Sequence, residues 1–385
     1  MMEERMVKRF SAFSIFFLLL EMNICAQCSS IDGELGDRHK PAVLLVILAR
    51  NKAHTLPQYL GFIDNLDYPK DRISLWVRAD HSIDNTSAVL REWVNGAGPL
   101  YHSYDMRFDD SPSFFADEIG PMDWPESRYY HIINLREEAL NAARRMWADY
   151  AFFVDSDNFL EYEDTLNELI KQERLLVAPM LESSTAFSNF WCGQDENGYY
   201  KRTEEYLPTL QRERLGCFHV PMIHSTFLID LRQRKSDSLT FNPNKLKDYK
   251  HAVDDIIIFA QSARDAGIPM YICNHKEFGH MSVPRQPRET LEYDEECFAN
   301  LKLDAMTQYS QWEYRWNKTR KHYGEAEPML VSKYVTVPEK TKDSLGFDKV
   351  FLINLLRRPF RRRRMLASLA ELRVDAAIVD ATDGK

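Results

Sequence analysis

The chain has 385 residues, of which 44% are hydrophobic and 28% are charged. This is enough apolar content for one large globular domain or two ordinary ones, which excludes a disordered protein. The formal net charge of −9 at pH 7 argues against nucleic acid as a partner, because domains that bind nucleic acid carry a positive surplus.

The first 28 residues have the pattern of a secretory signal peptide. Arg5, Lys8 and Arg9 precede an apolar run over residues 10–20, and polar residues follow. The run is about half of the roughly 20 residues that cross a bilayer, which favours a cleaved signal over a short signal anchor. We therefore predict a mature chain in the secretory route, with no stable membrane span.

The cysteines and glycosylation sequons agree with that route. Cys25 and Cys28 lie in or beside the signal, and four cysteines remain in the mature chain: Cys192, Cys217, Cys273 and Cys297. Four cysteines allow three disulfide pairings, and an oxidising compartment favours at least one bridge. None of these pairs has the Cys-x-x-Cys spacing of a zinc site, so we predict none. Sequons begin at Asn85 and Asn317.

The first predicted elements form a strand, a helix and a second strand. Residues 42–49 are continuously apolar, as in a strand buried on both faces, and residues 55–66 and 74–79 follow as helix and strand. Such a crossover is right-handed, and loops after parallel strands bind ligands in α/β sheets. These loops carry Arg50, Asn51, Asp80 and His81, which we predict to hold a nucleotide.

A helix over residues 129–147 leads into a strand at residues 151–154 that ends in two acidic residues. Asp155 and Asp157 are one residue apart, so both carboxylates can reach one hard divalent cation, which in turn holds a diphosphate. The alternative is that one of them only caps a following helix. The context favours a metal site.

The next segments supply further strands and aromatic residues. A strand at residues 175–180 precedes a polar and aromatic loop, which we predict to form a sugar or acceptor pocket. Trp191 and Phe190 are either stacking platforms for a sugar or core aromatics. Residues 217–230 are apolar enough for a core strand, and their two histidines, His219 and His224, are expected to be satisfied core residues or, less commonly, sugar contacts.

Asp254 and Asp255 open a predicted helix over residues 256–266, which Gly267 closes and a strand at residues 268–273 follows. An aspartate at a helix start is a candidate general base, because the helix dipole favours its charged form. The alternative is that one of the two is the N-cap.

The chain ends in a second α/β segment. A polar linker at residues 336–346 separates the main domain, residues 41–335, from residues 347–385. A strand at 349–355, a helix at 359–372 and a strand at 377–379 are predicted there. This segment is too short to bury its own core and reads as a domain cut short. Its basic run, residues 357–364, is expected to be a solvated helix face or a phosphate contact.

The sequence resembles glycosyltransferase family 25 of animals, the procollagen galactosyltransferases and their cerebral endothelial adhesion-molecule paralogue, over nearly the whole chain. The segments that carry the resemblance are Leu48-Ala-Arg-Asn-Lys-Ala-His-Thr-Leu-Pro57, Asp80-His-Ser-Ile-Asp-Asn-Thr86, Val154-Asp-Ser-Asp-Asn158, Ala178-Pro-Met-Leu-Glu-Ser183, Ser188-Asn-Phe-Trp-Cys-Gly193, Val220-Pro-Met-Ile-His-Ser-Thr-Phe227 and Asp254-Asp-Ile-Ile257. The tail from Gly346 resembles the start of that family's second domain.

The resemblance implies a GT-A-like, Rossmann-type domain with a mainly parallel sheet. It also implies transfer of galactose from UDP-galactose to hydroxylysine of collagen, with inversion, using manganese, in the endoplasmic reticulum lumen. Asp155 and Asp157 match the metal motif, Asp255 or Asp254 is the expected base, and Arg50, Asn51, Asp80 and Trp191 are expected around the donor. His280 is a candidate third metal ligand.

Two departures from the family leave alternatives open. Family members carry a complete second domain and a C-terminal endoplasmic-reticulum retention tetrapeptide, whereas this sequence stops at Lys385. Secretion is therefore an alternative to retention. A catalytically inactive paralogue or fragment that acts in binding or cell adhesion is the alternative to an enzyme.

Overall fold

The computed structural model describes residues 40–196, 198–307, 329–338 and 341–382. The predicted signal peptide, the sequon at Asn317 and linker residues 339–340 lie outside the described residues. The described residues from Val43 onward belong to one unit, and the candidate site lies within it. No helix among the described residues is both long and apolar enough to cross a membrane.

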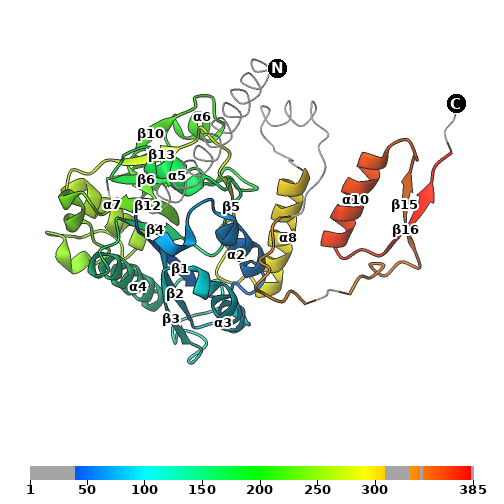
Figure 1. Cartoon of the computed structure of the whole chain (residues 1–385), viewed down its shortest axis with the longest axis horizontal. Helices are drawn as coiled ribbons and strands as arrows, with labels where there is room; N and C mark the ends of the chain where they lie inside the picture. Colours follow the sequence, from blue (N-terminus) through cyan, green and yellow to red (C-terminus); the bar gives the residue numbers. More distant parts are fainter. Residues whose placement is uncertain (1–39, 197, 308–328, 339–340, 383–385) are drawn as a thin grey trace, which may run out of the picture. The chain divides into compact units, whose positions relative to one another are not determined.

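The centre of this unit is an eight-stranded mixed sheet (Figure 1). In spatial order its strands are β10 (Cys217–Val220), β13 (Met270–Cys273), β6 (Leu176–Pro179), β12 (Thr226–Asp230), β4 (Tyr150–Val154), β1 (Val43–Ala49), β2 (Ile73–Asp80) and β3 (Ser103–Asp109). The pairs β1–β2, β2–β3, β1–β4 and β6–β13 are parallel. Strand β12 is antiparallel to both β4 and β6, and β10 is antiparallel to β13. The predicted α/β fold with a mainly parallel, GT-A-like central sheet is confirmed.

The sheet is buried on both faces, as the apolar sequences of its strands β1 and β4 require. All seven residues of β1 are buried. Leu45 and Ile47 belong to a core shared with α2 (Leu56–Asn65) and α3 (Thr86–Ala97). Leu44 and Val46 belong to a second core shared with α4 (Glu126–Arg145) and α7 (Asp255–Asp265). Alternate side chains of one strand thus enter two cores, as expected for a strand covered by helices on both sides.

The predicted helices α2, α4 and α7 and the strands β1, β2, β4, β6 and β13 are confirmed within a few residues. Helix α3 was not predicted. The single core strand predicted over residues 217–230 is wrong. The chain there makes three strands: β10, then β11 (Met222–Ile223), which pairs with β7 (Phe190–Trp191), and then β12. Pro221 has no N–H to donate and Ser225 has φ of 56°, so neither residue can continue a regular ladder.

The remaining elements are short or peripheral to the sheet. They are β5 (Asn158–Leu160), β8 (Gly193–Gln194), β9 (Tyr200–Lys201), β14 (Gly279–Met281), α5 (Thr165–Ile170), α6 (Tyr206–Leu210) and α8 (Leu291–Thr307), with 3-10 helices at Lys70–Arg72, Gly98–Leu100, Arg234–Ser238 and Pro243–Lys245. Strand β14 pairs with β5, directly after the acidic motif.

The C-terminal segment has the predicted strand, helix, strand order. Strands β15 (Val350–Asn354) and β16 (Ala376–Asp380) are parallel neighbours, and α10 (Pro359–Glu371) connects them. No residue of α10 is buried, and Phe351 and Ile353 are 55% and 68% exposed. The described part of this segment buries few side chains, and Arg361 to Arg364 of its basic run lie on this helix.

Candidate active site

A pocket opens at the carboxyl ends of β1, β2 and β4, where parallel strands of an α/β sheet bind ligands. Four residues predicted from the sequence line it: Arg50, Asp80, Asp155 and Asp157. Helix α4 and the irregular segment before it contribute a further group of lining residues: Phe115, Trp124, Arg128, His131, Ile132, Leu135 and Arg136. The structure therefore brings these four residues together in one pocket, whereas Asn51, His81 and Trp191 are not among its lining residues.

Arg136 connects the acidic motif to the start of α7. Its Nη2 donates to both carboxylate oxygens of Asp155, at 3.0 and 2.9 Å. Its Nε lies 2.8 Å from Oδ2 of Asp255. Burial raises the pKa of Asp155 to about 6 against the opposing effect of Arg136, and the charges of Asp157 and Asp255 raise it further. Two carboxylates, those of Asp155 and Asp255, thus share one buried guanidinium.

Asp157 is paired in the same way with Lys52. The Lys52 Nζ lies 3.1 Å from Oδ2 of Asp157 and 3.2 Å from Oδ2 of Asp294 on α8. Asp294 also accepts a hydrogen bond from Arg285 Nε at 2.9 Å and lies 3.1 Å from His54 Nε2. Burial would raise the pKa of Asp294, but its hydrogen bond to His54 and the charge of Lys52 hold it well below its usual range.

The two aspartates fit a divalent cation that is shared with a diphosphate. Their side chains remain 27% and 28% exposed, so a ligand can reach them from the pocket. Over the described part of the chain, neither Asp155 nor Asp157 belongs to a group of three clustered His, Cys, Asp or Glu ligands. Mg²⁺ and Mn²⁺ prefer oxygen ligands, and two protein carboxylates with phosphate oxygens and water in the other positions would provide such a set.

His280, the candidate third ligand, is engaged elsewhere. It lies on β14, which pairs with β5, and its Nδ1 is 2.6 Å from Oε1 of Glu161. The structure therefore gives no support to His280 as a ligand beside Asp155 and Asp157.

The opposite end of the pocket is built from aromatic rings and a shared carboxylate. Asp80 Oδ1 lies 2.9 Å from His81 Nδ1, and its Oδ2 lies 2.7 Å from Nε2 of His131. Burial would raise the pKa of Asp80, but the hydrogen bonds with His131 and His81 lower it. The His81 ring stacks on Phe115 with centroids 4.0 Å apart. Arg50 donates to the carbonyl of His81 at 2.9 Å.

Arg50 is not free to meet a ligand without rearrangement. Its Nη2 lies 2.7 Å from both carboxylate oxygens of Glu118, and its guanidinium carbon lies 5.1 Å from the Phe115 ring centroid. The segment around Phe115 and Glu118 is thereby held against the end of β1. Arg50 positions this wall of the pocket.

Asn51 and Trp191 lie outside the pocket lining. Asn51 is buried with φ of 55°, and its Oδ1 accepts a hydrogen bond from the Ile83 backbone N–H at 2.9 Å, so its side chain fixes the loop after β2. Trp191 stacks with Tyr200 and Tyr206, with ring centroids 5.1 and 5.8 Å apart. The predicted donor contacts of these two residues remain predictions. Phe190 is fully buried and is a core aromatic.

The two adjacent aspartates of α7 differ in their surroundings. Asp254 is the N-cap: its Oδ1 accepts from the backbone N–H groups of Ile256 at 2.9 Å and Ile257 at 3.1 Å. Its Oδ2 accepts from the Tyr200 hydroxyl at 2.7 Å. Burial and the charge of Asp255 raise the pKa of Asp254. The capping role foreseen for one of the two belongs to Asp254, and Asp255 faces Arg136.

His224 is buried between β11 and β12. Burial and the charge of Arg136 lower its pKa to about 3, so the ring is neutral at physiological pH. Its Nε2 is buried and has no hydrogen-bond partner among the described residues. The predicted core position and hydrogen bond to the backbone are confirmed for His224, which bonds the backbone of Ser188. The same prediction is wrong for His219, which is exposed on β10.

Sequence reasoning missed Arg136, the residue that links most of this site. It shares one face of α4 with Ile133 and Leu140, three residues before and four after it, and both are buried core residues. A charged residue on the apolar face of an amphipathic helix was the available signal, because burying a charge is costly unless it is paired.

Comparison with known proteins places the domain in a family. Residues 40–302 match the model of the glycosyltransferase family 25 N-terminal domain. The chain is 47% identical over 345 residues to human procollagen galactosyltransferase 2, covering 90% of this chain and 52% of the relative. It is 44% identical to human inactive glycosyltransferase 25 family member 3, covering 89% of this chain and 55% of the relative. The chain thus spans about half the length of the curated relatives it matches.

Two solved structures are similar at low identity. One is the mannosyltransferase PcManGT from Pyrobaculum calidifontis in complex with GDP-Man and Mn²⁺, at 15% identity and a TM-score of 0.38, covering 75% of this chain and 66% of that one. The other is GalNAc-T7 with UDP, GalNAc and Mn²⁺, at 12% identity and a TM-score of 0.44, covering 74% and 55%. From the family match over residues 40–302, the chain belongs to glycosyltransferase family 25.

Proposed function

We propose that this chain binds UDP-galactose with manganese and transfers galactose, with inversion, to hydroxylysine of collagen. The observation that carries the proposal is the convergence of Asp155, Asp157, Asp80 and Arg50 on one pocket at the carboxyl ends of parallel strands. The galactose and collagen parts of the proposal rest on the relatives, which are procollagen galactosyltransferases. The endoplasmic reticulum lumen is the proposed compartment, with secretion as the alternative.

The two ends of the pocket suit the two halves of a nucleotide sugar. The rings of Phe115 and His81 and the carboxylate of Asp80 suit a nucleoside, which needs stacking and hydrogen bonds. Asp155 and Asp157 would hold the manganese, which when bound neutralises the departing diphosphate. Arg136 and Lys52 lie beside these carboxylates and would keep the local charge balanced before and after the donor binds.

We assign the general base to Asp255 and not to Asp254. Both oxygens of Asp254 are engaged by backbone N–H groups and by Tyr200. Asp255 has one ion pair, with Arg136, which also contacts Asp155. In this arrangement Asp255 takes the proton from the acceptor hydroxyl while the sugar leaves the diphosphate.

The test is a transfer assay with UDP-galactose, Mn²⁺ and a collagen peptide that contains hydroxylysine. Asp255→Asn is expected to lower transfer by about 10²-fold or more, since a positioned base contributes about 10² to 10⁴, while binding of UDP is retained. Asp265→Asn, at the far end of α7, is the matched control and should leave transfer unchanged. Equal transfer by wild type and Asp255→Asn would overturn the assignment.

A binding protein without turnover is the second candidate function. Two observations favour it: a 44% identical relative is named an inactive member of the family, and both metal-motif carboxylates are already paired with protein cations. The same assay separates the two candidate functions. A binding protein without turnover should bind UDP-galactose but neither transfer galactose nor release it. Protease protection in microsomes tests the proposed compartment.

A further inference from the structure

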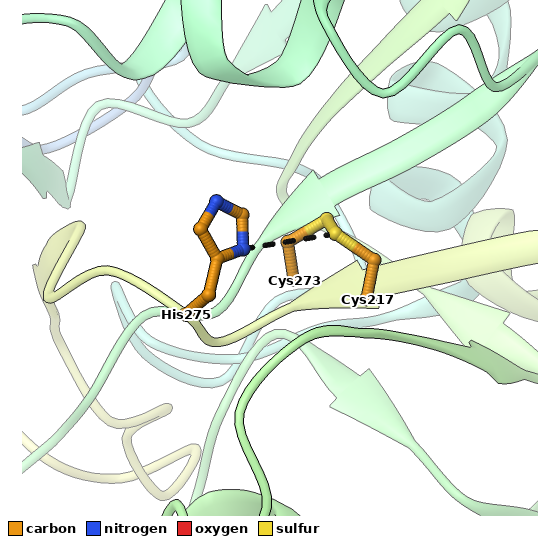
Figure 2. A group of neighbouring side chains, drawn as sticks. All are labelled: Cys217, Cys273 and His275. Carbon is orange, nitrogen blue, oxygen red and sulfur yellow. Dashed lines mark hydrogen bonds between the residues drawn. A yellow bond between two sulfur atoms is a disulfide. The ribbon is translucent and has the colours of Figure 1, made fainter.

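Two cysteines and a histidine cluster at the β10 edge of the sheet, and none of them lines the pocket described above. Cys217 on β10 and Cys273 on β13 stand directly opposite each other in the antiparallel pair and are joined by a disulfide. His275 lies two residues beyond Cys273, and its Nδ1 is 3.8 Å from Cys217 Sγ (Figure 2). A sulfur in a disulfide has no proton to donate, so this contact acquires a chemical role only when the bridge is open.

Neighbouring side chains fix the orientation of the His275 ring. Its Nε2 lies 3.3 Å from Oε2 of Glu168, and a carboxylate can only accept, so Nε2 carries the proton. In the neutral ring, Nδ1 is then the nitrogen without a proton, and it faces Cys217 Sγ. Phe278 packs edge-on against the ring, with centroids 5.6 Å apart and an angle of 90°.

The loop that carries His275 is anchored independently of the disulfide. Asn274 is fully buried, and it exchanges hydrogen bonds of 2.9 Å with the backbone of Gly216 through its own N–H and its Oδ1. Its Nδ2 donates to the carbonyls of Thr209 and Arg214, both at 2.9 Å. These four bonds hold His275 beside Cys217 whether or not the two sulfurs are bonded.

We propose that, in the dithiol form, Cys217, Cys273 and His275 form a binding site for a Zn²⁺-class cation, and that the disulfide closes this site. In a tetrahedral zinc site with Zn–S of about 2.3 Å and Zn–N of about 2.1 Å, a sulfur and a nitrogen ligand lie about 3.6 Å apart. The observed separation of 3.8 Å between Cys217 Sγ and His275 Nδ1 is close to that value. Two thiolates and an imidazole are ligands that zinc prefers.

The surroundings supply the rest of a zinc site. Glu168 accepts the second ring N–H of the histidine, as carboxylates commonly do behind zinc-bound histidines. Gln172 Oε1 lies 3.2 Å from Cys217 Sγ, so an oxygen ligand or a water is available for the fourth position. Cys217 and His275 are half-buried while Cys273 is fully buried, so a cation has an approach from one side.

The redox step balances with a low-molecular-weight thiol as the reductant. Two thiol molecules reduce the Cys217–Cys273 disulfide, giving two cysteine thiols and one small disulfide. Zinc binding then releases the two thiol protons to solvent. In the reverse direction a small disulfide oxidises the two thiolates, is itself reduced to two thiolates, and expels the zinc.

The proposed site departs from the expectation that the chain has no zinc site. The expectation rested on the absence of Cys-x-x-Cys spacing in the mature chain. Here the ligands come from two strands whose cysteines are 56 residues apart in sequence. Antiparallel pairing, which sequence spacing does not reveal, brings them together.

The test measures Zn²⁺ binding to the full-length chain before and after reduction with a trialkylphosphine. Cys25, Cys28, Cys192 and Cys297 are replaced with serine, so that only Cys217 and Cys273 remain as sulfur ligands. The reduced protein is expected to bind one equivalent of Zn²⁺ in competition with a chromophoric chelator, and the oxidised protein none. With Co²⁺ in place of Zn²⁺, thiolate-to-metal charge-transfer absorption should appear only after reduction.

Point variants separate this site from adventitious binding. Glu168→Gln should weaken Zn²⁺ binding by about 10-fold to 100-fold, and His275→Gln should weaken it more. Lys171→Gln removes the other ion-pair partner of Glu168, which lies 2.7 Å away, and serves as the matched control with unchanged affinity.

Three results would overturn the proposal. One is a reduced wild-type chain that binds no zinc, and another is a His275→Gln variant that binds it as tightly as the parent. The third is loss of the folded far-ultraviolet circular dichroism spectrum on reduction, because the site requires β10 and β13 to stay paired.

Discussion

The two ends of the pocket are built from different kinds of side chain. At the β2 end, one carboxylate, Asp80, is shared by His81 and His131, and Phe115 stacks on His81. At the β4 end, Asp155 and Asp157 each face a protein cation, Arg136 or Lys52. The first end is ordered by rings and hydrogen bonds, and the second is ordered by charge.

This difference indicates how each end should respond to change. Aromatic stacking is worth about 1 kcal/mol per pair, so the β2 end should tolerate single substitutions. A buried charge that loses its partner costs about 3–5 kcal/mol. Single substitutions at the β4 end should therefore be strongly destabilising. A nucleoside can bind to the first end with little rearrangement, whereas a cation at the second end must compete with Arg136 and Lys52.

The largest expected effect is that of Arg136→Ala on stability. It leaves Asp155 and Asp255 buried without their cation, and breaking such a pair costs about 3–5 kcal/mol. Urea denaturation measures the loss of unfolding free energy. Arg145→Ala, at an exposed position of the same helix, should change it by about 0.5 kcal/mol or less. Equal effects of the two variants would refute the central role of Arg136.

Asp294→Asn should cost about 3 kcal/mol at pH 7, because it leaves Lys52, His54 and Arg285 without their shared carboxylate. The pKa of Asp294 is depressed in the folded chain. Its contribution is therefore complete above the ordinary aspartate pKa of about 3.9 and declines as pH falls below it.

The check on Asp294 is chemical denaturation of both proteins between pH 3 and pH 7. The difference between wild type and Asp294→Asn should be smaller at pH 3 than at pH 7. A difference that is constant over this range would show that the ion pairs of Asp294 do not stabilise the fold.

The smallest effect is expected at the β2 end. Phe115→Ala removes a ring that lines the pocket, and the loss of one stacking contact with the nucleoside should cost about 1 kcal/mol, or about a fivefold loss in UDP affinity. Phe114→Ala is the matched control, since that side chain is 60% exposed and does not line the pocket. A loss of UDP affinity of 100-fold or more for Phe115→Ala would contradict the proposed difference between the two ends of the pocket.

The part of the site predicted from sequence lies at strand ends. Asp155 and Asp157 follow a continuously apolar strand, and Asp80 ends a mostly apolar one. Such strands can be recognised without a structure. Arg136 and His131 come from a helix that approaches from another layer, and Phe115 comes from a segment with no periodicity. Nothing local in the sequence places these three against the strand ends.

One error in the fold prediction and two questions that the sequence left open have the same origin. The high apolar content of residues 217–230 predicted a single strand. Pro221 has no N–H to donate, so a regular β-ladder ends there. Only the structure shows which of Asp254 and Asp255 is the N-cap, because either side chain could have accepted hydrogen bonds from the first N–H groups of α7. The cysteine pairing depended on the register of β10 against β13, which long-range pairing decides.

The most direct test of the central claim is a calorimetric titration of UDP-galactose into the chain with and without Mn²⁺. The wild type is compared with the Asp155→Ala, Asp157→Ala double variant. We predict manganese-dependent binding by the wild type and its loss in a double variant that keeps the wild-type circular dichroism spectrum. Absence of binding by a folded wild type, or equal binding by the double variant, would contradict a metal-dependent donor site at Asp155 and Asp157.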